Sequence, residues 1–167
     1  MVHYKYTKKD YYKKFLSISS DLRDLEEDLH AFDPTNNSEE QRRILRSIVC
    51  IFNNVEQYIL DMCELYLVSN NLFSNGDISG IGLVSDMANN CKDIRIYEKL
   101  FINIVKLRDS ATHVYYIDDY KQSIVNLLSN NLKDLNHGVK MLSDIICKPA
   151  ASKEMSKALG NFNIKRR

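Results

Sequence analysis

The feature that most constrains the fold is a run of apolar residues between positions 45 and 66 in which steps of three and four alternate. Such steps place side chains on one face of an α-helix, because the helix has 3.6 residues per turn. A second apolar line beside the first widens the face that must be buried. The two lines are Leu45, Ile48, Phe52, Val55, Ile59, Met62 and Tyr66, and Ile44, Ile51, Tyr58 and Leu65. We therefore predict a long helix at the centre of a bundle.

The segment that precedes this run has the same period. Apolar residues between positions 11 and 29 recur in alternating steps of four and three, which predicts a first helix. A connector containing Pro34 is expected to end it, because proline breaks the helical hydrogen-bond pattern. Ser38, followed by Glu39 and Glu40, is expected to cap the next helix.

Three further helical segments are predicted after the central run. Residues 78–91 are expected to form one short or irregular helix, and another helix is expected to begin near Asp93. A final long helix is predicted over residues 117–146, weakened locally by Gly138. Pro149 is expected to end it.

The scarcity of glycine and proline supports an all-α fold. Five Gly and two Pro are too few for a chain of many short strands and tight turns. We predict an antiparallel bundle of four to five main helices, formed by residues 1–147 as a single domain. Residues 148–167 are expected to be a basic C-terminal tail.

The formal charge of +1 is distributed unevenly along the chain. Residues 1–20 carry +4 and residues 148–167 carry +5, which leaves −8 for the segment between them. Basic ends could attract a polyanion, because lysine and arginine bind phosphates without sequence preference. The alternative is that both ends are solvated termini without a ligand.

Several classes of protein and site are not expected. The N-terminus lacks the apolar run of a signal peptide, and no stretch approaches 18 uninterrupted apolar residues. The four cysteines show no C-x-x-C spacing, and the four histidines lie far apart, so no metal site and no cofactor are predicted. We predict a cytoplasmic protein with reduced thiols and no membrane contact.

The residues best suited to catalysis lie between positions 106 and 118, where the helix that begins near Asp93 is expected to end and the last helix to begin. Asp109 and His113 are four residues apart, so on a continuing helix they share a face and the carboxylate could orient the imidazole. Arg108, Thr112 and Tyr115 are spaced by four and three residues and form an adjacent face.

An arginine and a histidine are suited to cleaving RNA without a metal. The imidazole can take a proton from a 2′-hydroxyl or give one to the leaving oxygen. The guanidinium can bind the phosphate and stabilise the charge of the transition state. The alternative is a structural role, in which Arg108, Asp109 and His113 cap a helix and tie two helices together.

The string from Arg108 to Tyr115 resembles the R-x4-H-x-Y signature of HepT-like toxins, within the HEPN superfamily of helical RNases and nucleotide-binding domains. The similarity is best over residues 40–146. It implies a homodimer in which two motifs meet at one cleft, and an endoribonuclease in which Arg108 and His113 are catalytic, with Asp109 at the polar second position of the motif.

The same resemblance implies a biological role and a means of control. It implies the toxin of a toxin–antitoxin or anti-phage defence system, with a nucleotidyltransferase antitoxin as a possible partner. Tyr115 matches the tyrosine that such an antitoxin modifies with AMP, and Thr112 is expected in the same cleft. The alternative function is a non-catalytic helical interaction or nucleotide-binding module of the same architecture.

Overall fold

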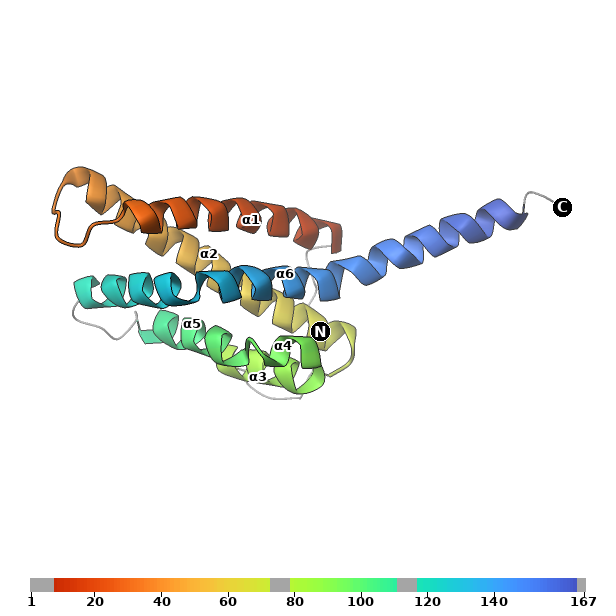
Figure 1. The fold of residues 1–167 in the computed structure, drawn as a ribbon. Coiled ribbons are helices and arrows are strands. Elements are labelled where there is room, and N and C mark those ends of the chain that lie inside the picture. Colours follow the sequence, from red (N-terminus) through yellow and green to blue (C-terminus); the bar gives the residue numbers. More distant parts are fainter. Residues whose placement is uncertain (1–7, 73–78, 111–116, 165–167) are drawn as a thin grey trace.

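The computed structural model describes residues 8–72, 79–110 and 117–164, and every regular element in these ranges is a helix (Figure 1). Five longer helices and one single-turn helix are present there, so the predicted all-α bundle is confirmed. The elements are α1 (Lys8–Ala31), α2 (Glu39–Ser69), α3 (Gly80–Asn90), α4 (Lys92–Arg95), α5 (Glu98–Ser110) and α6 (Ile117–Ile164).

Helices α2 and α6 form the centre of the bundle. They pack against each other, α1 packs against both, and α5 also packs against both. Figure 1 shows that α1 and α5 run opposite to α2 and α6. The connection between α1 and α2, the end of α5 and the start of α6 therefore lie at one end of the bundle, which we call the motif end.

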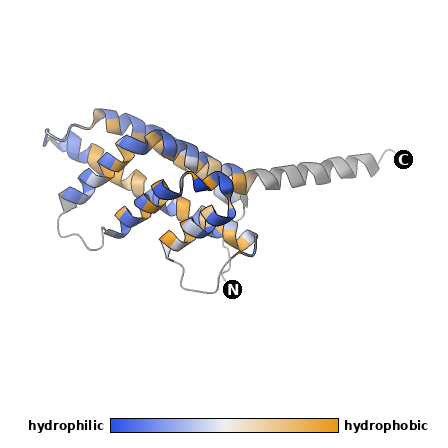
Figure 2. Cartoon of the chain, turned by 60° about the horizontal axis from the view of Figure 1, so that its bottom comes forward, coloured by the Kyte–Doolittle hydropathy of each residue, from blue (hydrophilic) through white to orange (hydrophobic). Residues whose placement is uncertain are grey.

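The central helix buries the face that its sequence predicts. The apolar residues of its main stripe from Ile48 to Met62 are buried, and Leu45 and Tyr66 at its ends are half-buried. On α1 the stripe is buried at Tyr11, Ile18, Leu22 and Leu25. Hydrophobic and hydrophilic residues alternate along each helix of the bundle (Figure 2). Burial of these faces supplies the main stabilisation, about 25 cal/mol for each Å² of apolar surface.

The cap of α2 is formed as predicted. The Oγ of Ser38 accepts a hydrogen bond from the backbone N–H of Gln41 at 3.3 Å. Ser79 caps α3 in the same way, with Oγ accepting from the N–H of Gly82 at 3.1 Å. Each cap satisfies an N–H group that has no partner within its helix.

Two predicted helix boundaries are wrong. The helix expected from Asp93 is divided into α4 and α5, because the N–H of Tyr97 bonds to the carbonyl of Ile94 in a tighter turn, at 2.8 Å. The last helix does not end at Pro149 but continues to Ile164. A proline removes one hydrogen bond from a helix and bends it, and this local cost does not stop a helix of 48 residues.

Gly138 of α6 lies close to Phe101 of α5 and to Tyr97, the residue before α5. A Cβ atom at this position would lie 2.7 Å from Cζ of Phe101 and 3.1 Å from Cδ1 of Tyr97. The glycine that weakens α6 locally therefore makes room for an aromatic ring of the core. Phe101 is fully buried and stacks on Tyr97, with ring centroids 6.1 Å apart.

Candidate functional site

Arg108 occupies the last turn of α5, at the motif end of the bundle, and its side chain is half-buried. A cation in this position interacts favourably with the partial negative charge at a helix C-terminus. Asp109 follows it and is exposed. The other predicted site residues, Thr112, His113 and Tyr115, lie outside the described residues. Of the predicted site residues, the structure therefore describes only Arg108 and Asp109.

The structure adds a residue that the sequence reasoning missed. Glu56 of α2 is 7% exposed and lies within electrostatic range of Arg108. Burial raises the pKa of the Glu56 carboxyl above its ordinary value of 4.5, and the guanidinium of Arg108 acts in the opposite direction. The charges of Asp109 and Asp61 raise it further. Opposite charges within this range each favour the charged form of the other.

Tyr120 of α6 is the third member of this group, which we call the Arg108 cluster (Glu56, Arg108 and Tyr120). Its side chain is half-buried. Burial raises the pKa of the Tyr120 phenol, the charge of Arg108 lowers it, and that of Glu56 raises it. The three residues come from α2, α5 and α6, so the cluster joins both central helices to the helix that carries the motif.

A second polar group connects this region to α1. Lys14 of α1 forms an ion pair with Asp61 of α2, and Nε2 of Gln57 donates to Oδ1 of Asp61 at 2.8 Å. Asp61 also acts electrostatically on Glu56, one and a half turns earlier on the same helix. The first helix, which lies outside the range of the HEPN resemblance, thus packs as part of the same bundle.

Arg108 is the member of the Arg108 cluster whose side chain is suited to binding an anion. A guanidinium carries five N–H donors in a fixed plane, which suits it to pair with the oxygens of a phosphate. Arginine also stays charged at any pH at which a protein is folded. Within the part of the chain that the structure describes, no group of three or more His, Cys, Asp or Glu side chains is placed to share a metal ion.

The cysteines are free thiols. Cys63 and Cys91 are buried, Cys147 is half-buried and Cys50 is exposed. Burial, with a smaller contribution from Cys91, raises the pKa of the Cys63 thiol to about 12. Since the thiolate is the reactive form, Cys63 is a core residue and not a nucleophile.

Comparisons with known proteins assign no family. No protein-family model, no curated protein and no solved structure matches the chain. Among the helices in the described ranges, none has both the length and the apolarity needed to cross a membrane. The site must therefore be interpreted from its own residues.

The burial of Glu56 could have been predicted from the sequence. Glu56 lies four residues after Phe52 and three before Ile59, so it shares a helix face with two core residues. A single acidic residue on an otherwise apolar face of a central helix is a buried charge, and buried charges need a partner. The opposite charge that acts on Glu56 is Arg108, which is more than 50 residues away in the sequence and comes within electrostatic range only in the folded bundle.

Glu56→Gln is expected to stabilise the fold at neutral pH. The raised pKa of Glu56 means that the folded state holds the proton more tightly than the unfolded state. Its contribution to stability is thus present at low pH and lost as pH rises through the folded pKa. Chemical unfolding should show a higher free energy of unfolding for Glu56→Gln than for wild type at pH 7 and no difference near pH 4.

Glu64→Gln, on the same helix but outside the cluster, is the matched control for this measurement. A stability gain that is equal at pH 4 and pH 7 would contradict the assignment of Glu56 as a buried, titrating carboxyl.

Proposed function

We propose that this protein is a metal-independent endoribonuclease of the HEPN type, and the toxin of a toxin–antitoxin or anti-phage defence system. One observation supports the proposal most directly. The arginine of the R-x4-H-x-Y pattern is half-buried at the end of α5, within electrostatic range of the buried Glu56 and of Tyr120. A guanidinium that is partly exposed at a helix end can bind the phosphate of a substrate.

In this proposal His113 acts as the acid–base group and Arg108 binds the scissile phosphate. His113 removes the proton of a 2′-hydroxyl, and the 2′-oxygen attacks the phosphorus. The bond from phosphorus to the 5′-oxygen of the next nucleotide breaks, and that oxygen takes a proton from the imidazolium of a His113. The products are a 2′,3′-cyclic phosphate and a 5′-hydroxyl. Asp109 orients the imidazole of His113.

The proposal includes assembly and control. The enzyme is a cytoplasmic homodimer in which two copies of the motif form one cleft, through the helix that ends at Arg108 and the segment from His113 to Tyr120. Thr112 and Tyr115 belong to this cleft. A nucleotidyltransferase antitoxin would add AMP to Tyr115, and the added phosphate would pair with Arg108 and repel the RNA backbone.

Incubation of the purified protein with total RNA in EDTA tests the proposed activity. We expect cleavage to persist in the chelator and the fragments to end in 2′,3′-cyclic phosphate, detected by mass spectrometry. These ends follow from attack by the 2′-hydroxyl, whereas attack by water would leave a linear phosphate and a 3′- or 5′-hydroxyl. Cleavage that stops in EDTA, or fragments with 3′-hydroxyl ends, would refute the proposed mechanism.

A further inference from the structure

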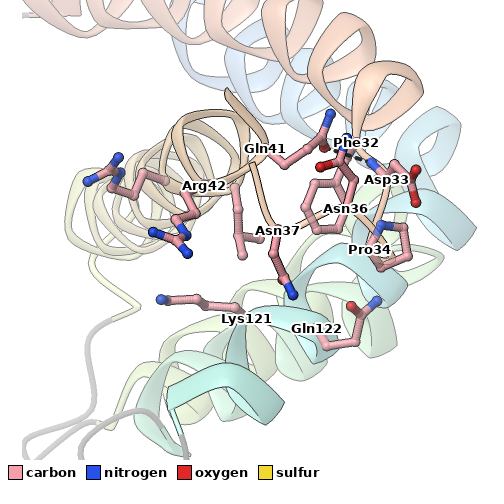
Figure 3. Close-up of a pocket in the computed structure, with 11 residues that line it drawn as sticks. Phe32, Asp33, Pro34, Asn36, Asn37, Gln41, Arg42, Lys121 and Gln122 are labelled. Atoms are coloured by element: carbon pink, nitrogen blue, oxygen red, sulfur yellow. Dashed lines mark hydrogen bonds between the residues drawn. The ribbon is translucent and has the colours of Figure 1, made fainter. Parts of the chain in front are cut away.

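A cavity of about 650 Å³ lies at the motif end of the bundle, outside the Arg108 cluster. Its walls are the connection between α1 and α2, the first two turns of α2 and the start of α6. Figure 3 shows Arg42 and Lys121 on facing helices at one side, with Phe32, Asp33 and Pro34 toward the other. The volume lies in the range of sites that hold a nucleotide-sized ligand, roughly 300–1,000 Å³.

The lining is rich in groups that bind anions. Arg42 and Arg46 of α2 and Lys121 of α6 contribute three positive charges, and Asp33 contributes one negative charge. Side-chain amides complete the polar part of the lining, at Asn36, Asn37, Gln41 and Gln122. Arginines form paired hydrogen bonds to phosphate, and amides donate without adding charge.

The one carboxylate of the lining is already engaged by the loop. Oδ1 of Asp33 accepts hydrogen bonds from the N–H and the hydroxyl of Thr35, at 2.9 and 2.7 Å. These bonds lower the pKa of Asp33. Gln41 fixes the same loop to α2, because its Oε1 accepts from the N–H of Asp33 at 2.8 Å and its Nε2 donates to the carbonyl of Ala31 at 3.1 Å. These hydrogen bonds fix the loop that forms one wall of the cavity.

Both arginines are held by a weak partner that a phosphate can replace. Glu39 lies 2.7 Å from Nη2 of Arg46 and 3.9 Å from Nη1 of Arg42, and all three side chains are well exposed. Exposed ion pairs of this kind contribute about 0–1 kcal/mol. A phosphate group carries more negative charge and more acceptor oxygens than one carboxylate, so it can compete for both guanidinium groups.

We propose that this cavity binds a phosphorylated small molecule of about nucleotide size. Its phosphate groups lie between Arg42, Arg46 and Lys121, and its less polar part lies against Phe32 and Leu45. The inference is independent of the proposed RNase function, because none of these residues belongs to the Arg108 cluster or to the R-x4-H-x-Y pattern. Lys121 directly follows Tyr120, so an occupied cavity and the Arg108 cluster share the first turns of α6.

Isothermal titration with ADP, pyrophosphate, adenosine and a single-stranded RNA tests this site. We expect ADP and pyrophosphate to bind and adenosine to bind much more weakly, because the charged contacts dominate. Arg42→Gln, Arg46→Gln and Lys121→Gln should each weaken ADP binding about tenfold, as expected for the loss of one charge-assisted contact. Glu39→Gln should strengthen binding, because it removes the competing carboxylate.

The matched control is Arg43→Gln, an exposed arginine next to Arg42 that does not line the cavity. It should leave ADP binding unchanged. The proposal is overturned if Arg43→Gln weakens binding as much as Arg42→Gln, which would indicate general charge attraction. It is also overturned if neither ADP nor pyrophosphate binds at millimolar concentration, or if only single-stranded RNA binds, which would make the cavity part of a nucleic-acid surface.

Discussion

Arg108→Ala and His113→Ala are each expected to remove almost all RNA cleavage by the purified protein while the helical bundle remains folded. A positioned acid–base group contributes about 10²–10⁴-fold to the rate, and a preorganised donor to the transition-state charge contributes about 10²–10³-fold. Arg108 is half-buried at the end of α5, so its loss removes little of the core. Cleavage of a fluorescent RNA, with circular dichroism to monitor the fold, measures both effects.

Lys106→Ala is the matched control, because Lys106 is an exposed cation on the same helix two residues earlier. It should retain cleavage, since it removes charge but no part of the motif. Arg108→Lys separates charge from geometry. Lysine keeps the positive charge but cannot form the paired hydrogen bonds of a guanidinium, so most of the activity should still be lost.

Mixing the two inactive variants tests whether the site is shared between two chains. If Arg108 of one subunit acts with His113 of the other, a mixed dimer contains one intact site of two. Random mixing should then restore about a quarter of the wild-type cleavage. No recovery after the subunits have exchanged would contradict a composite site. Full activity of either single variant would contradict the proposed chemistry altogether.

The fold was predictable from the sequence where local pattern decides structure. The alternating steps of α2 and the capping serine at position 38 are local features, and the structure contains both. The break at Ile96 and Tyr97 was not predictable in this way, because the apolar pattern continues across it and only the hydrogen bonding changes. The continuation of α6 beyond Pro149 was not predictable from the proline alone, because a proline can bend a helix without ending it.

The site was only half predictable, for a related reason. Arg108 was predicted as a site residue because it belongs to a short motif within one segment, and its role stays a prediction. Glu56, Tyr120 and the cavity depend on helices that are distant in sequence, and no local spacing relates them. The cavity near Arg42 combines a loop, the start of α2 and the start of α6, so its basic character is visible only when these segments are brought together.

Removal of the Phe101 ring from the contact between α5 and α6 is expected to have the largest effect on stability. Phe101→Ala should lower the free energy of unfolding by about 3–5 kcal/mol, because it removes a fully buried ring and leaves a cavity. Domains of this size have only about 5–15 kcal/mol in total. Phe101→Leu retains most of the side-chain volume and should cost clearly less. Urea unfolding followed by circular dichroism gives the values.

The effect of Gly138→Ala on stability should change sign between wild type and the Phe101→Ala variant. In wild type, Gly138→Ala gains about 1 kcal/mol in helix propensity but places Cβ against the ring of Phe101, and overpacking of a core costs about 1–3 kcal/mol. The net result should be destabilising, because the ring is fully buried between its neighbours and cannot move away. In Phe101→Ala the nearest obstacle is absent, and the Tyr97 ring, 3.1 Å from the new Cβ, can shift into the vacated space, so Gly138→Ala should stabilise the protein by about 1 kcal/mol. If Gly138→Ala has the same effect in both backgrounds, the ring does not determine the need for glycine, and the close approach of α5 to α6 is not what Gly138 provides.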